Sequence, residues 1–77
     1  MIIEISTNDY ESYFKITNDQ LRALVSLTPV KAEEYIRKNC EKATIHCTDE
    51  ISFGMAPNCE KWEWEEFISE IEEHLDE

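Results

Sequence analysis

The C-terminal stretch Cys59–Glu77, with the sequence CEKWEWEEFISEIEEHLDE, contains the strongest structural pattern in the chain. Its apolar residues recur three, four and seven positions apart, as they do on one face of an α-helix. These residues are Trp64, Phe67, Ile68, Ile71 and Leu75. Burial of one such side chain contributes up to about 1.5–3 kcal/mol. We therefore predict a helix over this stretch that packs its apolar stripe against a sheet.

Most other positions of this stretch are acidic. It holds nine acids and one base, Lys61, for a net charge of −8, whereas the first 58 residues hold nine acids and six bases, for −3. Like charges three or four residues apart on a helix cost about 0.2–0.5 kcal/mol per pair, and acids near a helix C-terminus oppose the macrodipole. Since burial of the stripe outweighs these costs, we expect the helix to form only when it is docked on the domain.

Trp62 lies about opposite the apolar stripe on a helical projection. The acids on the same side are Glu63, Glu66, Glu70 and Glu73. Two interpretations stay open. Trp62 either folds onto a loop near Pro57, as an ordinary apolar residue of the first helical turn, or it is an exposed anchor of the kind that dominates binding energy at interfaces. We name Trp62 and these four acids as the candidate partner-binding residues.

Upstream of the helix, alternation of apolar and polar residues predicts four strands, at 2–6, 10–16, 43–48 and 51–55. In the second strand Tyr10, Ser12, Phe14 and Ile16 alternate with Glu11, Tyr13 and Lys15. The intervening segments Thr7-Asn8-Asp9 and Asp49-Glu50 are typical turn sequences. The strands are therefore expected to form two hairpins.

Helical signals lie between the two predicted hairpins. Thr17 and Gln20 match a capping box. Pro29 behind Thr28 ends or kinks this helix and starts a second segment that continues to about Asn39, because proline suits the first helical position. We interpret the pair as one kinked crossover helix. A DNA-binding helix-turn-helix is less favoured, because the second segment lacks a basic or amide-rich face.

The predicted order is ββαββα, with Asn58 as the N-cap of the last helix. This order is typical of a small two-layer α+β domain with an antiparallel sheet of about four strands. A length of 77 residues indicates a single domain, residues 1–77, and a hydrophobic content of 42% can supply its core.

The net charge of −11 disfavours direct binding to nucleic acid or to anionic membranes, and it favours a basic protein surface as partner. The alternative is that the charge serves only to keep the protein soluble. Glu4 follows Met1 too closely for a signal peptide, and three cysteines make a disulfide framework improbable. We expect a reduced, cytoplasmic protein.

Four residues could be imagined as a zinc site: Cys40, His46, Cys47 and Cys59. His46 and Cys47 would point to opposite faces of a predicted strand, and no C-x2-C pair is present, so we expect no metal. Cys47 is instead expected in the core and Cys40 at a helix end. A helix N-terminus would lower the pKa of the Cys59 thiol, but neighbouring Glu60 and Glu63 would oppose this, so a reactive thiol is not expected.

No catalytic arrangement is readable either. His46 and His74 lack a recognisable nucleophile or orienting group, and the single glycine, Gly54, excludes a glycine-rich phosphate loop. We therefore predict a protein without enzyme activity and without a cofactor.

In size and charge the chain resembles the small phage-type inhibitors of host defence nucleases, such as anti-CRISPR and anti-restriction proteins. The resemblance is one of composition and rests on no shared motif. It implies an acidic inhibitor that mimics nucleic acid and occupies a basic, nucleic-acid-binding surface of another protein. The alternative is an assembly or regulatory subunit whose acidic helix serves solubility only.

Overall fold

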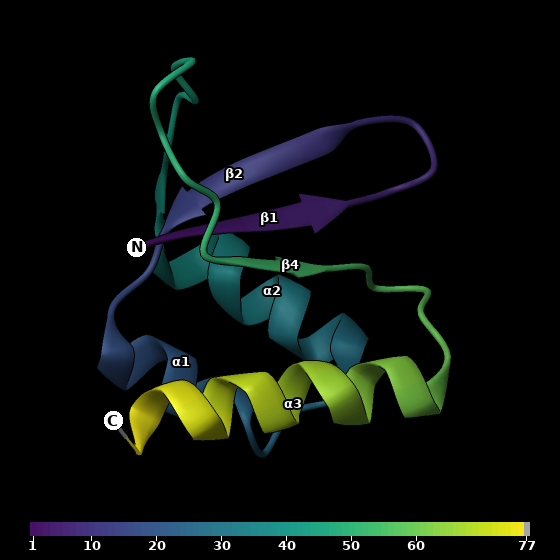
Figure 1. Ribbon diagram of the computed structural model, residues 1–77. Helices are drawn as coiled ribbons and strands as arrows, with labels where there is room; N and C mark the ends of the chain where they lie inside the picture. Colours follow the sequence, from purple (N-terminus) through teal and green to yellow (C-terminus); the bar gives the residue numbers. More distant parts are fainter. Residues whose placement is uncertain (77) are drawn as a thin grey trace.

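The computed structural model describes residues 1–76 (Figure 1). Within these residues the domain has two layers: a sheet of four strands on one side and three helices on the other. The elements follow the order β1, β2, α1, α2, β3, β4, α3. The predicted α+β class is confirmed, but the sheet is mixed and not purely antiparallel.

The predicted first hairpin is confirmed. β1, Ile2–Ser6, pairs antiparallel with β2, Glu11–Lys15. Period-two alternation buries Ile3 and Ile5 on the helix side, with Ser12 and Phe14 beside them. Tyr10, predicted as the first residue of the second strand, instead precedes β2, and its side chain is 59% exposed.

Two separate helices take the place of one kinked helix. α1, Asn18–Leu24, begins with the predicted capping box, in which the Gln20 amide donates to Thr17 Oγ1 (3.2 Å) and the Thr17 amide donates to Gln20 Oε1 (2.9 Å). α2, Pro29–Asn39, begins behind Thr28, whose side chain accepts a hydrogen bond from the Lys31 amide. α1 has already ended at Leu24, and the extended backbone of Thr28 prevents the two helices from forming one continuous helix.

The predicted second hairpin is wrong. β3 is the short pair Glu41–Lys42, which lies antiparallel to β2, and β4, Phe53–Met55, lies parallel to β1. The sheet order is β3-β2-β1-β4, so β3 and β4 occupy opposite edges and cannot pair with each other. Residues 43–48, the predicted third strand, belong to a connection that projects from the domain at the upper left of Figure 1.

A local turn explains why this connection is not a strand. The His46 amide donates to Asp49 Oδ2 at 2.8 Å, and the Asp49 amide donates to the carbonyl of His46 at 3.0 Å. These bonds hold residues 46–49 in a turn, as an Asp side chain commonly does. The alternating side chains of 43–48 therefore have no buried face to cover.

α3, Lys61–Leu75, packs against α1 and β4. The predicted stripe is confirmed: Trp64, Phe67 and Ile71 are buried, and Ile68 and Leu75 are half-buried at its margins. The Trp64 indole N–H also donates to the Leu27 carbonyl at 3.1 Å, which ties α3 to the α1–α2 connection.

The predicted N-cap of this helix is wrong. Glu60 occupies the cap position without a side-chain capping bond. The side chain of Asn58 instead donates to Asn8 Oδ1 at 3.3 Å and so joins the approach to α3 to the β1–β2 turn. The side chain of Asn58 thus binds a residue distant in sequence and does not cap α3.

Candidate protein-binding surface on the last helix

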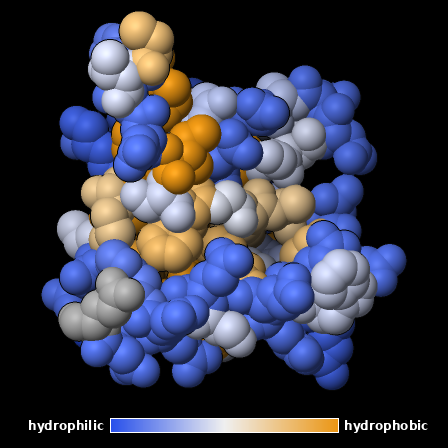
Figure 2. Space-filling view, in the orientation of Figure 1, coloured by the Kyte–Doolittle hydropathy of each residue, from blue (hydrophilic) through white to orange (hydrophobic). Residues whose placement is uncertain are grey.

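The outward side of α3 carries six carboxylates, and all of them are exposed. They are Glu63, Glu65, Glu66, Glu70, Glu72 and Glu73. Within residues 1–76, the ion pairs with N–O distances of up to 4.0 Å lie on the strands and on α1 and α2, and none includes an acid of α3. Figure 2 shows a continuous hydrophilic surface along this helix. The negative charge of α3 is therefore turned to solvent and is not neutralised by the fold.

Trp62 lies in the first turn of α3 with 57% of its side chain exposed. Its indole N–H donates to Glu60 Oε2 at 3.2 Å, which holds the ring against the start of the helix. The ring lines a shallow depression together with Glu65, Glu66, Ser69 and Glu70. The exposure that the second interpretation of Trp62 required is therefore present.

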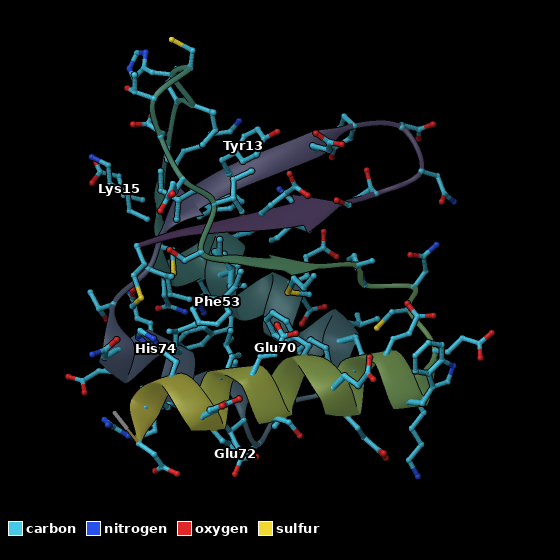
Figure 3. All side chains as sticks on the ribbon, in the orientation of Figure 1. Tyr13, Lys15, Phe53, Glu70, Glu72 and His74 are labelled. Atoms are coloured by element: carbon cyan, nitrogen blue, oxygen red, sulfur yellow. The ribbon has the colours of Figure 1, made fainter. Side chains whose placement is uncertain are left out.

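The five candidate residues do not form one cluster. Trp62, Glu66 and Glu70 meet at the depression, but Glu63 lies in a groove on the flank that faces β4. Glu73 is exposed one turn beyond Glu70. Figure 3 shows that Glu70 lies on the β4 side of α3 and Glu72 on the opposite side. The carboxylates therefore surround the outer half of the helix and do not form a single row.

Sequence reasoning missed two members of the depression, Glu65 and Ser69. They stand three and seven positions after Trp62. That helical spacing was the available signal, because residues three and seven positions apart share one face of a helix. We name the surface formed by Trp62, Glu65, Glu66, Ser69 and Glu70 the Trp62 surface.

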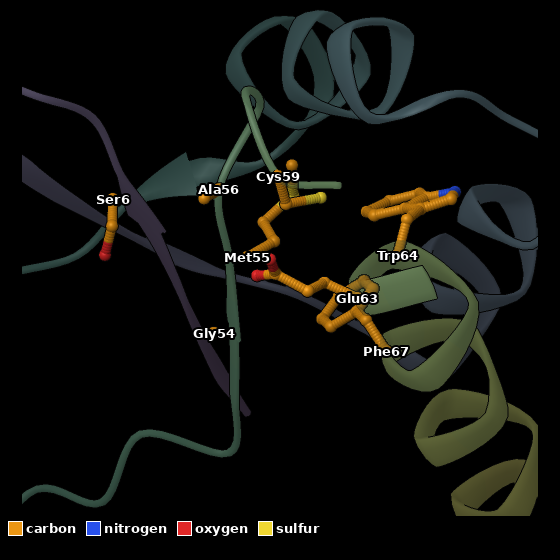
Figure 4. Close-up of a pocket in the computed structure, with 8 residues that line it drawn as sticks. All are labelled: Ser6, Gly54, Met55, Ala56, Cys59, Glu63, Trp64 and Phe67. Carbon is orange, nitrogen blue, oxygen red and sulfur yellow. The ribbon is translucent and has the colours of Figure 1, made fainter. Parts of the chain in front are cut away.

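The groove that contains Glu63 runs between β4 and α3 and has a volume of about 260 Å³. Its lining residues are Ser6, Gly54, Met55, Ala56, Cys59, Glu63, Trp64 and Phe67. Figure 4 shows the side chain of Glu63 extending from α3 towards β4. Apolar atoms thus form much of the lining, and one carboxylate stands at its edge.

Cys59 borders the same groove, outside the helix and one residue before the cap. Burial raises the pKa of its thiol, and the negative charge of Glu63 raises it further. Glu63 therefore raises the pKa of the Cys59 thiol as predicted, but burial has the larger effect, and Cys59 lies before the helix.

The other candidate metal ligands are far from forming a site. Cys40 is the C-cap of α2, as expected for a helix end, and burial raises its thiol pKa. Cys47, expected in the core, is exposed in the 43–52 connection. All three cysteines are free. Among residues 1–76, no three side chains of His, Cys, Asp or Glu are grouped in a way that could hold a metal ion.

His74 has a structural contact that the sequence did not reveal. Its Nε2 lies 3.1 Å from Asn18 Oδ1, and its ring meets Phe53 edge-on at 5.5 Å between centroids (Figure 3). His74 thereby links the end of α3 to α1 and β4. His46 lies in the exposed connection, remote from this contact.

None of the helices described in residues 1–76 is both long enough and apolar enough to cross a bilayer. Comparison with protein-family models, with curated proteins and with solved structures finds no match to this chain.

Proposed function

We propose that the protein is a small, non-enzymatic binding protein whose acidic helix occupies a basic surface of another protein, one that otherwise holds nucleic acid. The observation that supports this most directly is the set of exposed carboxylates on α3 that have no cationic partner within the described residues. Such charges are costly to the helix itself, and an external basic surface would compensate them.

The charge density of α3 fits this role. Fifteen helical residues span about 22 Å, so the six carboxylates occur about once every 4 Å along the axis. One strand of DNA carries a phosphate about every 3.4 Å of axis. Averaged along its axis, the helix thus has a charge density close to that of a single nucleic-acid strand, with the carboxylates spread around the outer half of the helix.

Trp62 adds a large apolar contact, which a purely electrostatic surface lacks. An exposed tryptophan among charges can be desolvated in a partner pocket, and tryptophan is among the residues that most often dominate interface energies. Its hydrogen bond to Glu60 restricts the ring before binding. Charge would then control the rate of association, and Trp62 would control the rate of dissociation.

The test is a capture experiment in extracts of the source organism, with the wild type and two charge-matched double variants as baits. The double variant Glu66→Lys, Glu70→Lys reverses the proposed surface, and Asp9→Lys, Glu50→Lys makes the same charge change on exposed loops elsewhere. The expected result is capture of a nucleic-acid-binding protein by the wild type and the loop variant, loss with the helix variant, and displacement by added duplex DNA.

Binding to the isolated partner should then weaken steeply with salt, since a Debye length of about 10 Å at 0.1 M screens exposed charges. Trp62→Ala should speed dissociation more than it slows association. Equal affinity of the helix variant and the wild type at low salt would contradict the proposal and favour an assembly subunit whose acids serve solubility.

A further inference from the structure

β4 is an outer strand of the sheet. It pairs with β1 on one side, and among residues 1–76 no strand lies on its other side. An outer strand leaves backbone N–H and C=O groups without ladder partners, and these groups can accept an additional strand. Gly54, at the centre of β4, is exposed and has no side chain to shield this edge.

The groove between β4 and α3 lies beside this strand (Figure 4). Met55 and Phe67 supply apolar lining. Its volume of about 260 Å³ is below the range of about 300–1,000 Å³ that is common for small-molecule sites. An open groove of this size next to a free strand edge suits the side chains of an extended peptide.

The charged residues around β4 indicate which kind of peptide would bind there. Glu63 stands at the groove, and on the open face of the sheet Glu4 lies beside Gly54, with its Oε1 3.9 Å from the position of a Cβ there. Neither carboxylate is in an ion pair within the described residues, and no lysine or arginine lines the groove. A second copy of this chain, with its own charge of −11, would be repelled.

We propose that β4 and the groove beside it are a docking site for an extended basic segment of a partner protein, which adds to the sheet as a strand along β4. Because successive side chains of a strand point to opposite faces, apolar residues would enter the groove beside Phe67 while basic residues between them reach over Gly54 towards Glu4. Glu63, at the edge of the groove, adds to the negative potential that attracts the basic segment. This site does not depend on the proposed function, because the residues of α3 that line the groove are not those of the Trp62 surface.

The test is a titration of the ¹⁵N-labelled protein with a short peptide that alternates lysine and valine. The control peptide replaces each valine by proline, which keeps the charge but prevents strand pairing. The chain has a single glycine, so the Gly54 amide gives an isolated signal. The alternating peptide should shift the amide signals of Gly54 and Met55, and it should bind about tenfold tighter than the control, as expected when backbone hydrogen bonds are lost.

Two matched variants locate the charge contact. Glu4→Gln should weaken the alternating peptide about two- to fivefold, whereas Glu50→Gln, with the same change of charge on the exposed 43–52 connection, should leave its affinity unchanged. Each variant keeps the size and shape of the side chain, so both variants should fold. Equal affinity for the two peptides, equal effects of the two variants, or shifts confined to the Trp62 surface would each overturn the proposal. Because these readouts do not use Glu66 or Glu70, failure here is distinguishable from failure of the proposed function.

Discussion

The inner and outer faces of α3 belong to one helix, but the inner face packs against the rest of the domain and the outer face does not. On the inner face Trp64 stacks on Phe67 at 5.0 Å between centroids, and Phe67 meets Phe53 edge-on at 6.4 Å. On the outer face six carboxylates have no partner among the described residues. The inner face therefore stabilises the fold, whereas the outer face is available for contacts with other molecules.

Loss of the inner face should have the largest effect on stability. Phe67→Ala removes a side chain that is only 7% exposed and leaves a cavity, so the free energy of unfolding should fall by about 3–5 kcal/mol. Urea unfolding followed by circular dichroism measures the change. Trp62→Ala on the outer face is the control and should stay within about 0.5 kcal/mol of the wild type. An unchanged midpoint for Phe67→Ala would show that α3 is not docked through this face.

A smaller effect should come from the hydrogen bond between Trp64 and the α1–α2 connection. Trp64→Phe keeps an aromatic ring but leaves the carbonyl of Leu27 without its donor, which should cost about 1–3 kcal/mol. The same unfolding experiment tests it. In addition, the amide signals of residues 25–28 should shift in a ¹⁵N spectrum. Stability equal to the wild type would mean that water replaces the indole at no cost.

The smallest effects should come from the outer face, and their sign should depend on position. Glu73→Lys places a cation near the C-terminal end of α3 and should raise the free energy of unfolding by about 0.3–1 kcal/mol. Glu63→Lys, in the first turn, should lower it by a similar amount. Destabilisation by Glu73→Lys would indicate that the acids of the outer face support the fold, and the contrast between the two faces would then be wrong.

Only part of the candidate site on α3 could be predicted from the sequence, namely its position on the acidic outer face. Helical periodicity identified the inner face and placed Trp62 opposite to it. Periodicity alone does not show which flank of the outer face adjoins another element. Glu63 and Glu66 are equally acidic in the sequence, yet one borders β4 and the other borders Trp62. That division depends on how α3 is oriented on the sheet.

The elements that the sequence by itself determined are those whose signals act over a few residues. The cap at Thr17, the proline at position 29 and the apolar stripe from Trp64 to Leu75 each satisfy their hydrogen bonds or define their buried face locally. The tertiary structure alone decided the edge position of β4 and its parallel pairing with β1, and with them the groove at Glu63. Strand partners are chosen by backbone bonds and side-chain packing between distant segments. Alternation within residues 43–55 could therefore suggest strands but could not specify which edges of the sheet they would join.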